Sequence, residues 1–442
     1  MKLSKRLDNL RTYPFHMPGH KRNQQFCITG SEIDITEIDG FDNLHNPTGV
    51  LNQLEKDISE IFGYKKSMIS VNGSTCGILA AICALCEKGD KIIIARNCHK
   101  SVYNACFLQE LDSVYLEPEF DTELGIYTRI TQEAVDKITK ENPDAKALVI
   151  TSPTYEGFIS ELDCKIPLIV DAAHGAHFGF SDWLPARAKG DIVIQSLHKT
   201  LPCLTQTAVV HINNSKYFDR VKMYMDIFES SSPSYILLNS VDKCVDFLKD
   251  CAVEFTQYKN KLDMFRSKAQ KLENITIHKN DDRTRLILSA DGYTGAELSE
   301  HLRKNGIEPE GASLNYVILI STVADTDRGF DLLLKALDST EKRKPLKNNI
   351  SKPEMPQRAC KSSDIKHTQI TAVKDSIGQI CGTYIYAYPP GIPIIVPGEI
   401  ISQEIIEKIS LYIKKGVNII SDDNLLPDNI LTKAAESCTI DT

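Results

Sequence analysis

The region between residues 68 and 210 alternates short apolar runs with helical segments, and this alternation constrains the fold more than any other feature. The apolar runs cover residues 68–71, 91–95, 113–116, 147–151, 167–170 and 191–195. Strands that alternate with helices pair in parallel through right-handed crossovers. The pattern therefore predicts an α/β fold with a mostly parallel central sheet and helices on both of its faces.

The rest of the chain predicts additional domains, because 442 residues exceed one ordinary core. A long helical stretch is expected from about residue 234 to 273, and two strands with a helix between them follow. Polar, Pro-containing sequence then predicts a linker. The predicted parts are an N-terminal segment (1–50), a large domain (51–255), a small α+β domain (256–340), the linker (341–361) and a C-terminal domain (362–442).

Composition and charge argue against several classes of protein. The net charge of −8 is spread along the chain, with no basic stripe for nucleic acid. No apolar run approaches the length of a membrane span, and the first residues lack the apolar stretch of a signal peptide. The 13 cysteines are therefore expected to be reduced thiols in a cytoplasmic protein.

The first candidate ligand site follows the apolar run that ends at Val71. Gly73 permits a tight turn, and a helix is expected to begin near Ser74, with Thr75 beside it. Hydroxyls and backbone N–H groups would then gather at a helix N-terminus, which can bind an anion. A plain helix cap explains the same residues and is favoured on sequence alone, whereas the position at a strand-to-helix switch favours a phosphate.

Three later strand ends carry side chains with distinctive chemistry. His99 follows one apolar run, Asp171 ends another, and Lys199 closes the Ser-Leu-His-Lys sequence after a third. An imidazole can stack on a ring or exchange protons, a carboxylate can pair with a pyridinium, and a lysine can form a Schiff base with an aldehyde. Each alone has an ordinary explanation, since loop histidines are usually solvated and aspartates often end strands.

Taken together, these strand ends supply a phosphate cup, a ring-stacking group, a pyridinium partner and an amine. That combination predicts a site for pyridoxal 5′-phosphate in the large domain. Its predicted residues are Ser74, Thr75, His99, Asp171, Ser196, His198 and Lys199.

Two other patterns do not support metal binding. His16 and His20 are four residues apart, but the Pro-Gly between them disfavours the helix that would bring them together. Cys83 and Cys86 lie in an apolar helical run without a second cysteine pair, so core packing is the better interpretation. We expect no metal site.

Nine segments, in the same order along nearly the whole chain, resemble the Orn/Lys/Arg decarboxylases, which are pyridoxal-phosphate-dependent enzymes of fold type I. The resemblance is strongest to short-form arginine decarboxylases that lack an N-terminal wing domain. The segments are residues 15–21, 34–49, 72–75, 96–101, 152–157, 171–175, 196–199, 232–235 and 388–399.

The resemblance implies a role for each predicted site residue. Lys199 would carry the cofactor, Asp171 would pair with the pyridine nitrogen, and His99 would stack on the ring. The catalytic residues would thus be these three. The implied phosphate ligands are Ser74, Thr75, Ser196 and His198.

The resemblance also implies a homodimer, or a higher homo-oligomer, with the active site at the interface. Residues 232–235 would reach the neighbouring subunit's phosphate, and Asp42, Asn43 and residues 388–399 would border the substrate entrance. A short connection at residues 157–166 and Ala172 depart from the family pattern, but neither removes a group that the chemistry requires.

The implied substrate is a basic amino acid: arginine giving agmatine first, then lysine giving cadaverine or ornithine giving putrescine, within polyamine metabolism. An aminotransferase shares the cofactor platform, although it would need an arginine to retain the α-carboxylate. The sequence alone assigns none to that task, and Arg358 and Arg22 stay open as candidates for it. A catalytically silent pyridoxal-phosphate-binding protein is a further alternative.

Overall fold

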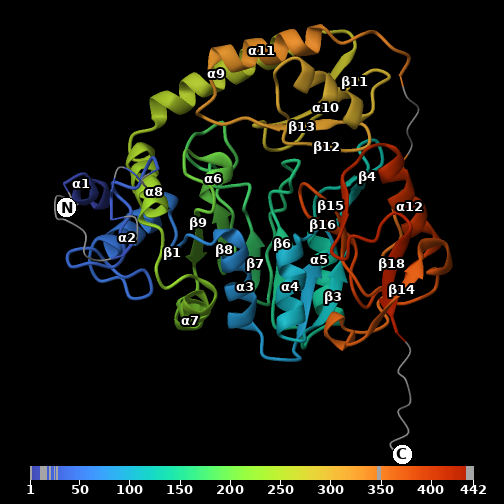
Figure 1. Ribbon diagram of the computed structural model, residues 1–442, viewed down its shortest axis with the longest axis horizontal. Coiled ribbons are helices and arrows are strands. Elements are labelled where there is room, and N and C mark those ends of the chain that lie inside the picture. Colours follow the sequence, from blue (N-terminus) through green and yellow to red (C-terminus); the bar gives the residue numbers. More distant parts are fainter. Residues whose placement is uncertain are drawn as a thin grey trace, which may run out of the picture. The chain divides into compact units, whose positions relative to one another are not determined.

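The computed structural model describes residues 2–9, 17–18, 21–23, 25, 28–345 and 350–434 (Figure 1). The chain divides into two compact units. The first comprises Met1–Leu85, Pro167–Asn260 and Thr322–Asp325. The second comprises Cys86–Ile166, Lys261–Ser321 and Thr326–Thr442. The five segments expected from the sequence stay a prediction.

The sheet strands of the first unit follow the order β1 (Lys66–Ser70), β9 (Ala208–Ile212), β8 (Ile192–Ser196) and β7 (Leu168–Asp171). The pair β7–β8 is parallel, whereas β9 is antiparallel to both β8 and β1. Because β9 alone is reversed, β1, β7 and β8 run in one direction and end at the same edge. Isoleucine and valine dominate these strands, as expected for residues buried on both faces.

Helices α2 (Val50–Phe62) and α3 (Gly73–Leu85) show how local sequence sets the elements around this sheet. α2 has one buried apolar face and ends at Gly63, whose φ of 69° suits a glycine at a helix end. α3 is apolar almost throughout and packs closely on the sheet. A methyl group on Gly77 would lie 2.6 Å from Val210 Cγ2 and 3.1 Å from Ile194 Cγ2.

The long helix expected from residue 234 to 273 is two helices. They are α8 (Tyr235–Leu248) and α9 (Ala252–Ala269), separated at residues 249–251. The expectation was therefore correct about helical character but wrong about continuity. The remaining short helices of the first unit are α1 (Leu3–Asp8), α6 (Leu197–Thr200), η1 (Ser215–Tyr217) and α7 (Phe218–Phe228).

In the second unit, β2 (Lys91–Ala95) pairs in parallel with both β3 (Asp112–Leu116) and β6 (Leu148–Thr151). These pairs confirm the parallel pairing expected from the alternating pattern. Accompanying elements are α4 (Lys100–Leu108), α5 (Gln132–Glu141) and the hairpin of β4 (Phe120–Asp121) and β5 (Ile126–Tyr127).

A small α+β group in the second unit matches the expected strand–helix–strand order. Its antiparallel sheet has the order β10 (Ile275–Ile277), β11 (Arg285–Ala290), β13 (Val317–Ile320) and β12 (Gly311–Ala312). Its helices are α10 (Gly295–Lys304) and α11 (Asp327–Asp338). α10 begins with a reciprocal capping box between Thr294 and Glu297, which satisfies backbone N–H groups at its start.

The C-terminal residues pack around a separate apolar cluster that includes Ile385, Ile395 and Ile409. Two small sheets and α12 (Gln403–Lys414) enclose it. One sheet holds β16 (Ile392–Ile395), β15 (Ile385–Ala387) and β17 (Ile419–Ser421); the other holds β14 (Thr368–Ala372) and β18 (Asn429–Lys433). Short 3-10 turns are η2 (Ser362–Asp364) and η3 (Val373–Asp375).

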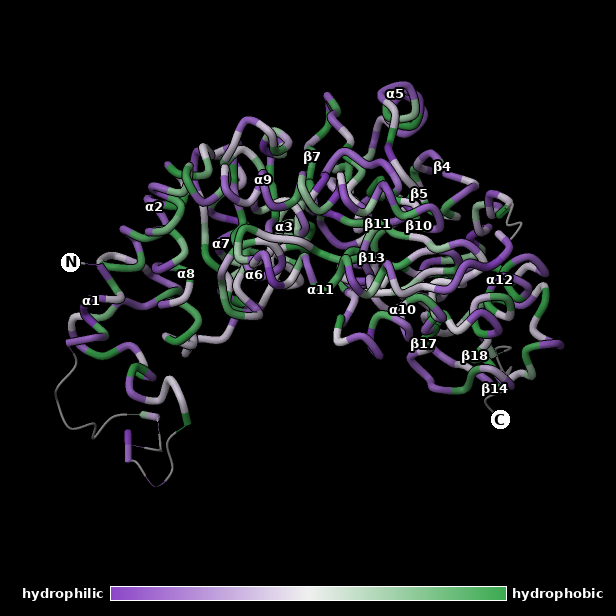
Figure 2. Tube along the Cα trace, turned by 90° about the horizontal axis from the view of Figure 1, so that it is seen from above, coloured by the Kyte–Doolittle hydropathy of each residue, from purple (hydrophilic) through white to green (hydrophobic). Residues whose placement is uncertain are grey.

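Hydrophobic and hydrophilic stretches interchange along the trace in Figure 2. Within the part of the chain that the structure describes, no helix combines the length and the apolar character needed to cross a membrane.

Candidate active site

The edge where β1, β7 and β8 end carries several of the predicted site residues. Ser196 is aligned with Ala208, and Ala208 is aligned with Ser70, so the ends of β8 and β1 are level across the sheet. Asp171, at the end of β7, is aligned with Ile194. This is the edge of an α/β sheet at which ligands usually bind.

Asp171 is a buried carboxylate, with 3% of its surface exposed. Its Oδ1 accepts a hydrogen bond of 3.1 Å from the Ala173 N–H. Burial raises the pKa of this carboxyl group, while the positive charge of Lys199 and the Ala173 hydrogen bond act in the opposite direction. Asp171 and Lys199 are therefore close enough to interact electrostatically, as the sequence analysis expected.

Lys199 lies in the single-turn helix α6, and its Nζ is 3.1 Å from Nε2 of His174. A lysine ammonium only donates hydrogen bonds, so Nε2 accepts and neutral His174 carries its proton on Nδ1. His174 belongs to the resembling segment 171–175, but the sequence analysis gave it no role. Its place in that segment was the only available signal, because the contact spans 25 residues of sequence.

Ser196 precedes α6 and His198 lies within it, and both offer polar groups to a ligand. Ser196 Oγ is completely buried and has no hydrogen-bond partner among the described residues. A buried hydroxyl without a partner costs about 1–3 kcal/mol, so a bound ligand would relieve it. His198 Nδ1 lies 2.9 Å from the Thr207 carbonyl oxygen, to which it donates. Burial lowers the pKa of His198, and Lys199 adds to this effect, whereas the Thr207 hydrogen bond opposes it.

Ser74 and Thr75 occupy the first turn of α3, as the sequence analysis expected. Gly73 adopts a φ of 75°, and its N–H donates a 2.8 Å hydrogen bond to the Gln206 carbonyl. This bond ties the turn to the loop that follows Lys199. The first unit thus groups six of the seven predicted residues around one sheet edge. The buried hydroxyl of Ser196, the buried carboxylate of Asp171 and the half-buried amine of Lys199 fit a phosphorylated pyridine aldehyde.

His99, the seventh predicted residue, belongs to the second unit and caps the N-terminus of α4. Its Nδ1 accepts a 3.2 Å hydrogen bond from the Ser101 N–H. In the neutral ring, the proton is then on Nε2. Nε2 faces Gly391, where an added β-carbon would lie 3.1 Å away.

Asp42, expected near the substrate entrance, instead uses its buried carboxylate within the fold. It accepts hydrogen bonds from the N–H groups of Thr48 (2.9 Å), Gly49 (2.6 Å) and Leu51 (3.1 Å) at the start of α2. Burial raises the pKa of Asp42, but these hydrogen bonds outweigh it and leave the pKa below its usual value. Asp42 is a helix cap, and a position of its loop at a substrate entrance stays a prediction.

The two discounted metal patterns have different outcomes. His16 and His20 lie outside the described residues. Cys83 and Cys86 are buried in and just after α3, in agreement with a core-packing role. Among the described residues, no group of three or more potential ligand side chains is placed to hold a metal ion.

Comparison with solved structures defines the class of protein. The chain superimposes on the lysine decarboxylase of Francisella novicida with a TM-score of 0.81 at 16% identity, covering 98% of this chain and 81% of that one. Enzymes with bound pyridoxal phosphate share the fold over a smaller part of the chain, at a TM-score of 0.53. The chain therefore shares the fold of the fold-type I enzymes, which confirms the predicted fold class.

Sequence comparison identifies the family. The model of the Orn/Lys/Arg decarboxylase major domain matches residues 3–279, and the model of the C-terminal domain matches residues 341–418. The arginine decarboxylase of Bacillus subtilis is 32% identical over 447 residues, covering 92% of this chain and 91% of the relative. That of Halalkalibacterium halodurans is 32% identical over 433 residues, covering 88% of each chain.

The chain belongs to the Orn/Lys/Arg decarboxylase family. It is a pyridoxal-phosphate-dependent amino-acid decarboxylase acting on a basic amino acid.

Proposed function

We propose that this chain converts arginine to agmatine and carbon dioxide, with pyridoxal phosphate held covalently by Lys199. The observation that carries the choice of arginine is the similarity to arginine decarboxylases along about nine tenths of both chains. Lysine and ornithine are the next candidates. The product would enter polyamine metabolism in the cytoplasm.

Residues of the first unit would each hold a different part of the cofactor. When bound, the cofactor supplies a ring that accepts the electron pair left by the departing carboxylate. The buried Asp171 would balance the positive charge of the pyridine nitrogen, and the unpartnered Ser196 hydroxyl would bind the phosphate. The remaining phosphate ligands would be Ser74, Thr75 and His198.

Lys199 and His174 form the pair that we propose moves a proton. Lys199 Nζ would carry the proton that is delivered to the substrate α-carbon. His174 Nε2, at 3.1 Å, would accept the Nζ–H hydrogen bond and so orient Nζ. His99, whose Nε2 carries a proton in the neutral ring, is the alternative donor.

Glu310 is our candidate for reading the distal positive charge of the substrate. Its carboxylate is exposed, and Oε1 accepts a 3.0 Å hydrogen bond from the Tyr155 hydroxyl. A β-carbon on the next residue, Gly311, would lie 3.7 Å from Pro389 Cγ. Pro389 is two residues from Gly391, which contacts His99. This chain of contacts within the second unit supports a carboxylate near the proposed ring-stacking residue.

A homodimer is our proposal for the assembly. Met223 and Ile227 lie one turn apart on α7 and are 47% and 62% exposed. An apolar pair on one helix face is suited to burial against a second copy. Sedimentation of the wild-type protein and of the Met223→Lys, Ile227→Lys variant tests this, and a wild-type monomer would refute it.

The aminotransferase alternative needs an arginine that holds the substrate carboxylate. Arg96 is buried against Glu399 and backbone carbonyls, and Arg358 is ion-paired with Asp112. Neither offers its guanidinium to a substrate, which favours decarboxylation. The silent cofactor-binding alternative is weakened by the intact pairing of Lys199 with Asp171 and His174.

The decisive experiment incubates the purified protein separately with arginine, lysine and ornithine. Carbon dioxide, amine and keto acid are quantified for each substrate, with Lys199→Ala as the matched inactive variant. We expect agmatine to form fastest. Keto acid without carbon dioxide would establish an aminotransferase, and cofactor binding without any product would establish the silent protein.

A further inference from the structure

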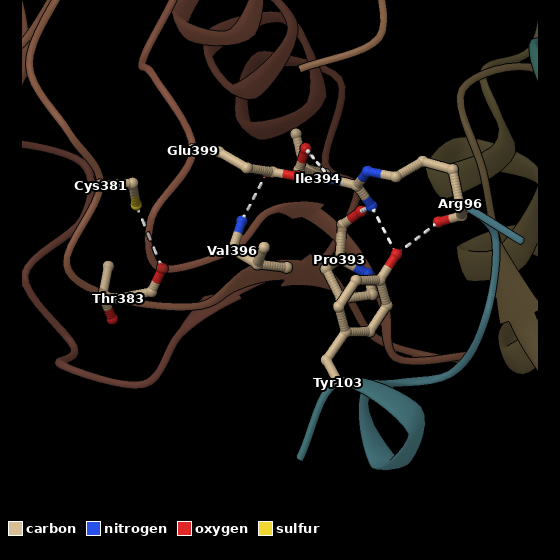
Figure 3. A network of polar contacts seen from close by, with 8 residues as sticks. All are labelled: Arg96, Tyr103, Cys381, Thr383, Pro393, Ile394, Val396 and Glu399. Carbon is tan, nitrogen blue, oxygen red and sulfur yellow. Dashed lines mark hydrogen bonds and ion pairs between the residues drawn. The ribbon is translucent and has the colours of Figure 1, made fainter. Parts of the chain in front are cut away.

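A buried ion pair joins the end of β2 to the C-terminal part of the chain (Figure 3). Arg96 follows β2 directly, and its Nη2 lies 3.1 Å from Oε2 of Glu399, a residue 303 positions later. The two side chains are 3% and 0% exposed. Removing one partner from a charge pair this deeply buried would leave an uncompensated charge in the interior.

Backbone hydrogen bonds extend the network on the side of the C-terminal segment. Arg96 Nη1 donates to the Pro393 carbonyl at 2.8 Å, and Nη2 donates to the Ile394 carbonyl at 3.0 Å. Glu399 Oε2 also accepts a 2.8 Å hydrogen bond from the Val396 N–H. Arg96 and Glu399 therefore hold the backbone of residues 393–399 from both ends.

On the other side of the network, Tyr103 fixes the position of Arg96. Arg96 Nη1 donates to the Tyr103 hydroxyl at 3.1 Å, and that hydroxyl donates to the Arg96 carbonyl at 2.8 Å. Tyr103 lies in α4, the helix that His99 caps. The guanidinium is thus anchored to the same strand-to-helix turn that carries His99.

The C-terminal segment contacts the chain on both sides of His99. Arg96 precedes His99 by three residues, and the N–H of the following residue, Lys100, donates a 3.1 Å hydrogen bond to the Gly391 carbonyl. Gly391 has a φ of 89°, and a β-carbon there would lie 3.1 Å from His99 Nε2. A glycine is required for so close an approach in this conformation.

We propose that Arg96 and Glu399 are positioning residues for His99. By docking residues 391–399 against the start of α4, they keep the Gly391 backbone against the Nε2 edge of the imidazole. The Ser101 N–H holds the opposite nitrogen, so the ring has one orientation. This inference rests on the proposed function, in which His99 stacks on the cofactor.

The test replaces Glu399 with glutamine in the full chain. Glu399→Gln keeps the side-chain shape and an oxygen for the Val396 N–H, but removes the charge that pairs with Arg96. We expect the dissociation constant for pyridoxal phosphate, measured by absorbance titration of the cofactor-free protein, to rise about tenfold, as for other outer-shell partners. Glu407→Gln, on the exposed face of α12, is the matched control and should bind like wild type.

A His99→Ala background separates positioning from general stabilisation. If Glu399 acts through His99, adding Glu399→Gln to His99→Ala should leave the dissociation constant unchanged. If the two substitutions instead multiply each other's effects on the dissociation constant, the proposal is refuted. Wild-type affinity in the Glu399→Gln single variant would also refute it. A second variant, Gly391→Ala, crowds His99 Nε2 without touching the ion pair and should also weaken binding.

If Glu399→Gln fails to fold, the Gly391→Ala variant tests the positioning role by itself. Wild-type affinity for pyridoxal phosphate in a folded Gly391→Ala protein would refute that role. Failure of the proposed function can be distinguished from failure of this inference. Lack of decarboxylation in a wild-type protein that binds the cofactor would refute the function, while the affinity comparison would still decide the role of Arg96 and Glu399.

Discussion

Two carboxylates on the outer edge of β1, the half-buried Glu55 and the buried Glu229, predict that the protein loses stability as the pH rises. Glu55, from α2, accepts a 3.1 Å hydrogen bond from the Ile69 N–H, and Glu229, at the end of α7, accepts one of 2.6 Å from the Val71 N–H. Ile69 and Val71 lead into the turn before Ser74. The two carboxylates thus satisfy N–H groups on the edge of β1 that no strand of its sheet pairs.

The pKa of Glu55 is raised to about 8, with burial as the largest cause; the charges of Glu229 and Asp42 contribute to the rise, whereas the Ile69 hydrogen bond and Lys222 act against it. Burial likewise raises the pKa of Glu229 to about 7. A carboxyl group with a raised pKa holds its proton more tightly in the folded state than in the unfolded chain. The folded protein is therefore most stable below the pKa that this group has in the unfolded chain. It loses stability as the pH rises towards the pKa of the group in the folded state.

The magnitude follows from about 1.36 kcal/mol per pKa unit. Compared with acidic pH, the raised pKa of Glu55 would then lower the free energy of unfolding by at most about 4 kcal/mol near pH 7.5. Glu55→Gln is neutral at every pH and keeps an oxygen for Ile69. Allowing for relaxation of the site, we expect the variant to gain about 1–3 kcal/mol at about pH 8 and almost nothing at about pH 5.

Thermal unfolding of wild type, Glu55→Gln and Glu60→Gln, followed by circular dichroism across this pH range, measures the effect. Glu60 lies on an exposed part of the same helix and is the matched control. A gain in melting temperature of about 1 °C per kcal/mol is expected for Glu55→Gln on the alkaline side only. Parallel pH profiles for wild type and Glu55→Gln would refute the reasoning.

Three further variants probe the site, and a fourth probes the packing of α3 on the sheet. Lys199→Ala should abolish borohydride-stable labelling by pyridoxal phosphate, and peptide mapping that finds the label elsewhere would move the attachment site. Asp171→Asn should retain labelling but reduce kcat by about a thousandfold, which steady-state assays with arginine would detect. Glu310→Gln should raise KM for arginine about tenfold with a smaller change in kcat, and an unchanged KM would remove Glu310 from the substrate site. Gly77→Ala should lower the unfolding free energy by about 1–3 kcal/mol, since its methyl group would overlap Val210, and denaturant titration checks this.

The fold class followed from local patterns because alternating strands and helices leave few ways to pair. The positions of Asp171 and Ser196 at strand ends were predictable for the same reason, since each ends an apolar run that becomes a strand. The start of α3 beside Ser74 was predictable from Gly73. The roles of these residues in holding the cofactor stay a prediction.

Other features had no local signal. The break between α8 and α9 at residues 249–251 falls within sequence that is helical in character throughout. In the sequence, Asp42 looks like any other loop aspartate, and only the packing shows that its carboxylate accepts hydrogen bonds from N–H groups at the start of α2. His174 was within a recognised segment, yet its contact with Lys199 depends on how two loops meet.

The sequence by itself determined the order of strands and helices, the chemical groups at their ends and the family to which they point. Only the tertiary structure decided which groups meet: His174 with Lys199, and Arg96 with Glu399 across 303 positions. The physical reason is the separation along the sequence over which each effect acts. Propensity and periodicity act over a few residues, whereas a buried charge acquires its partner only when packing excludes water from both.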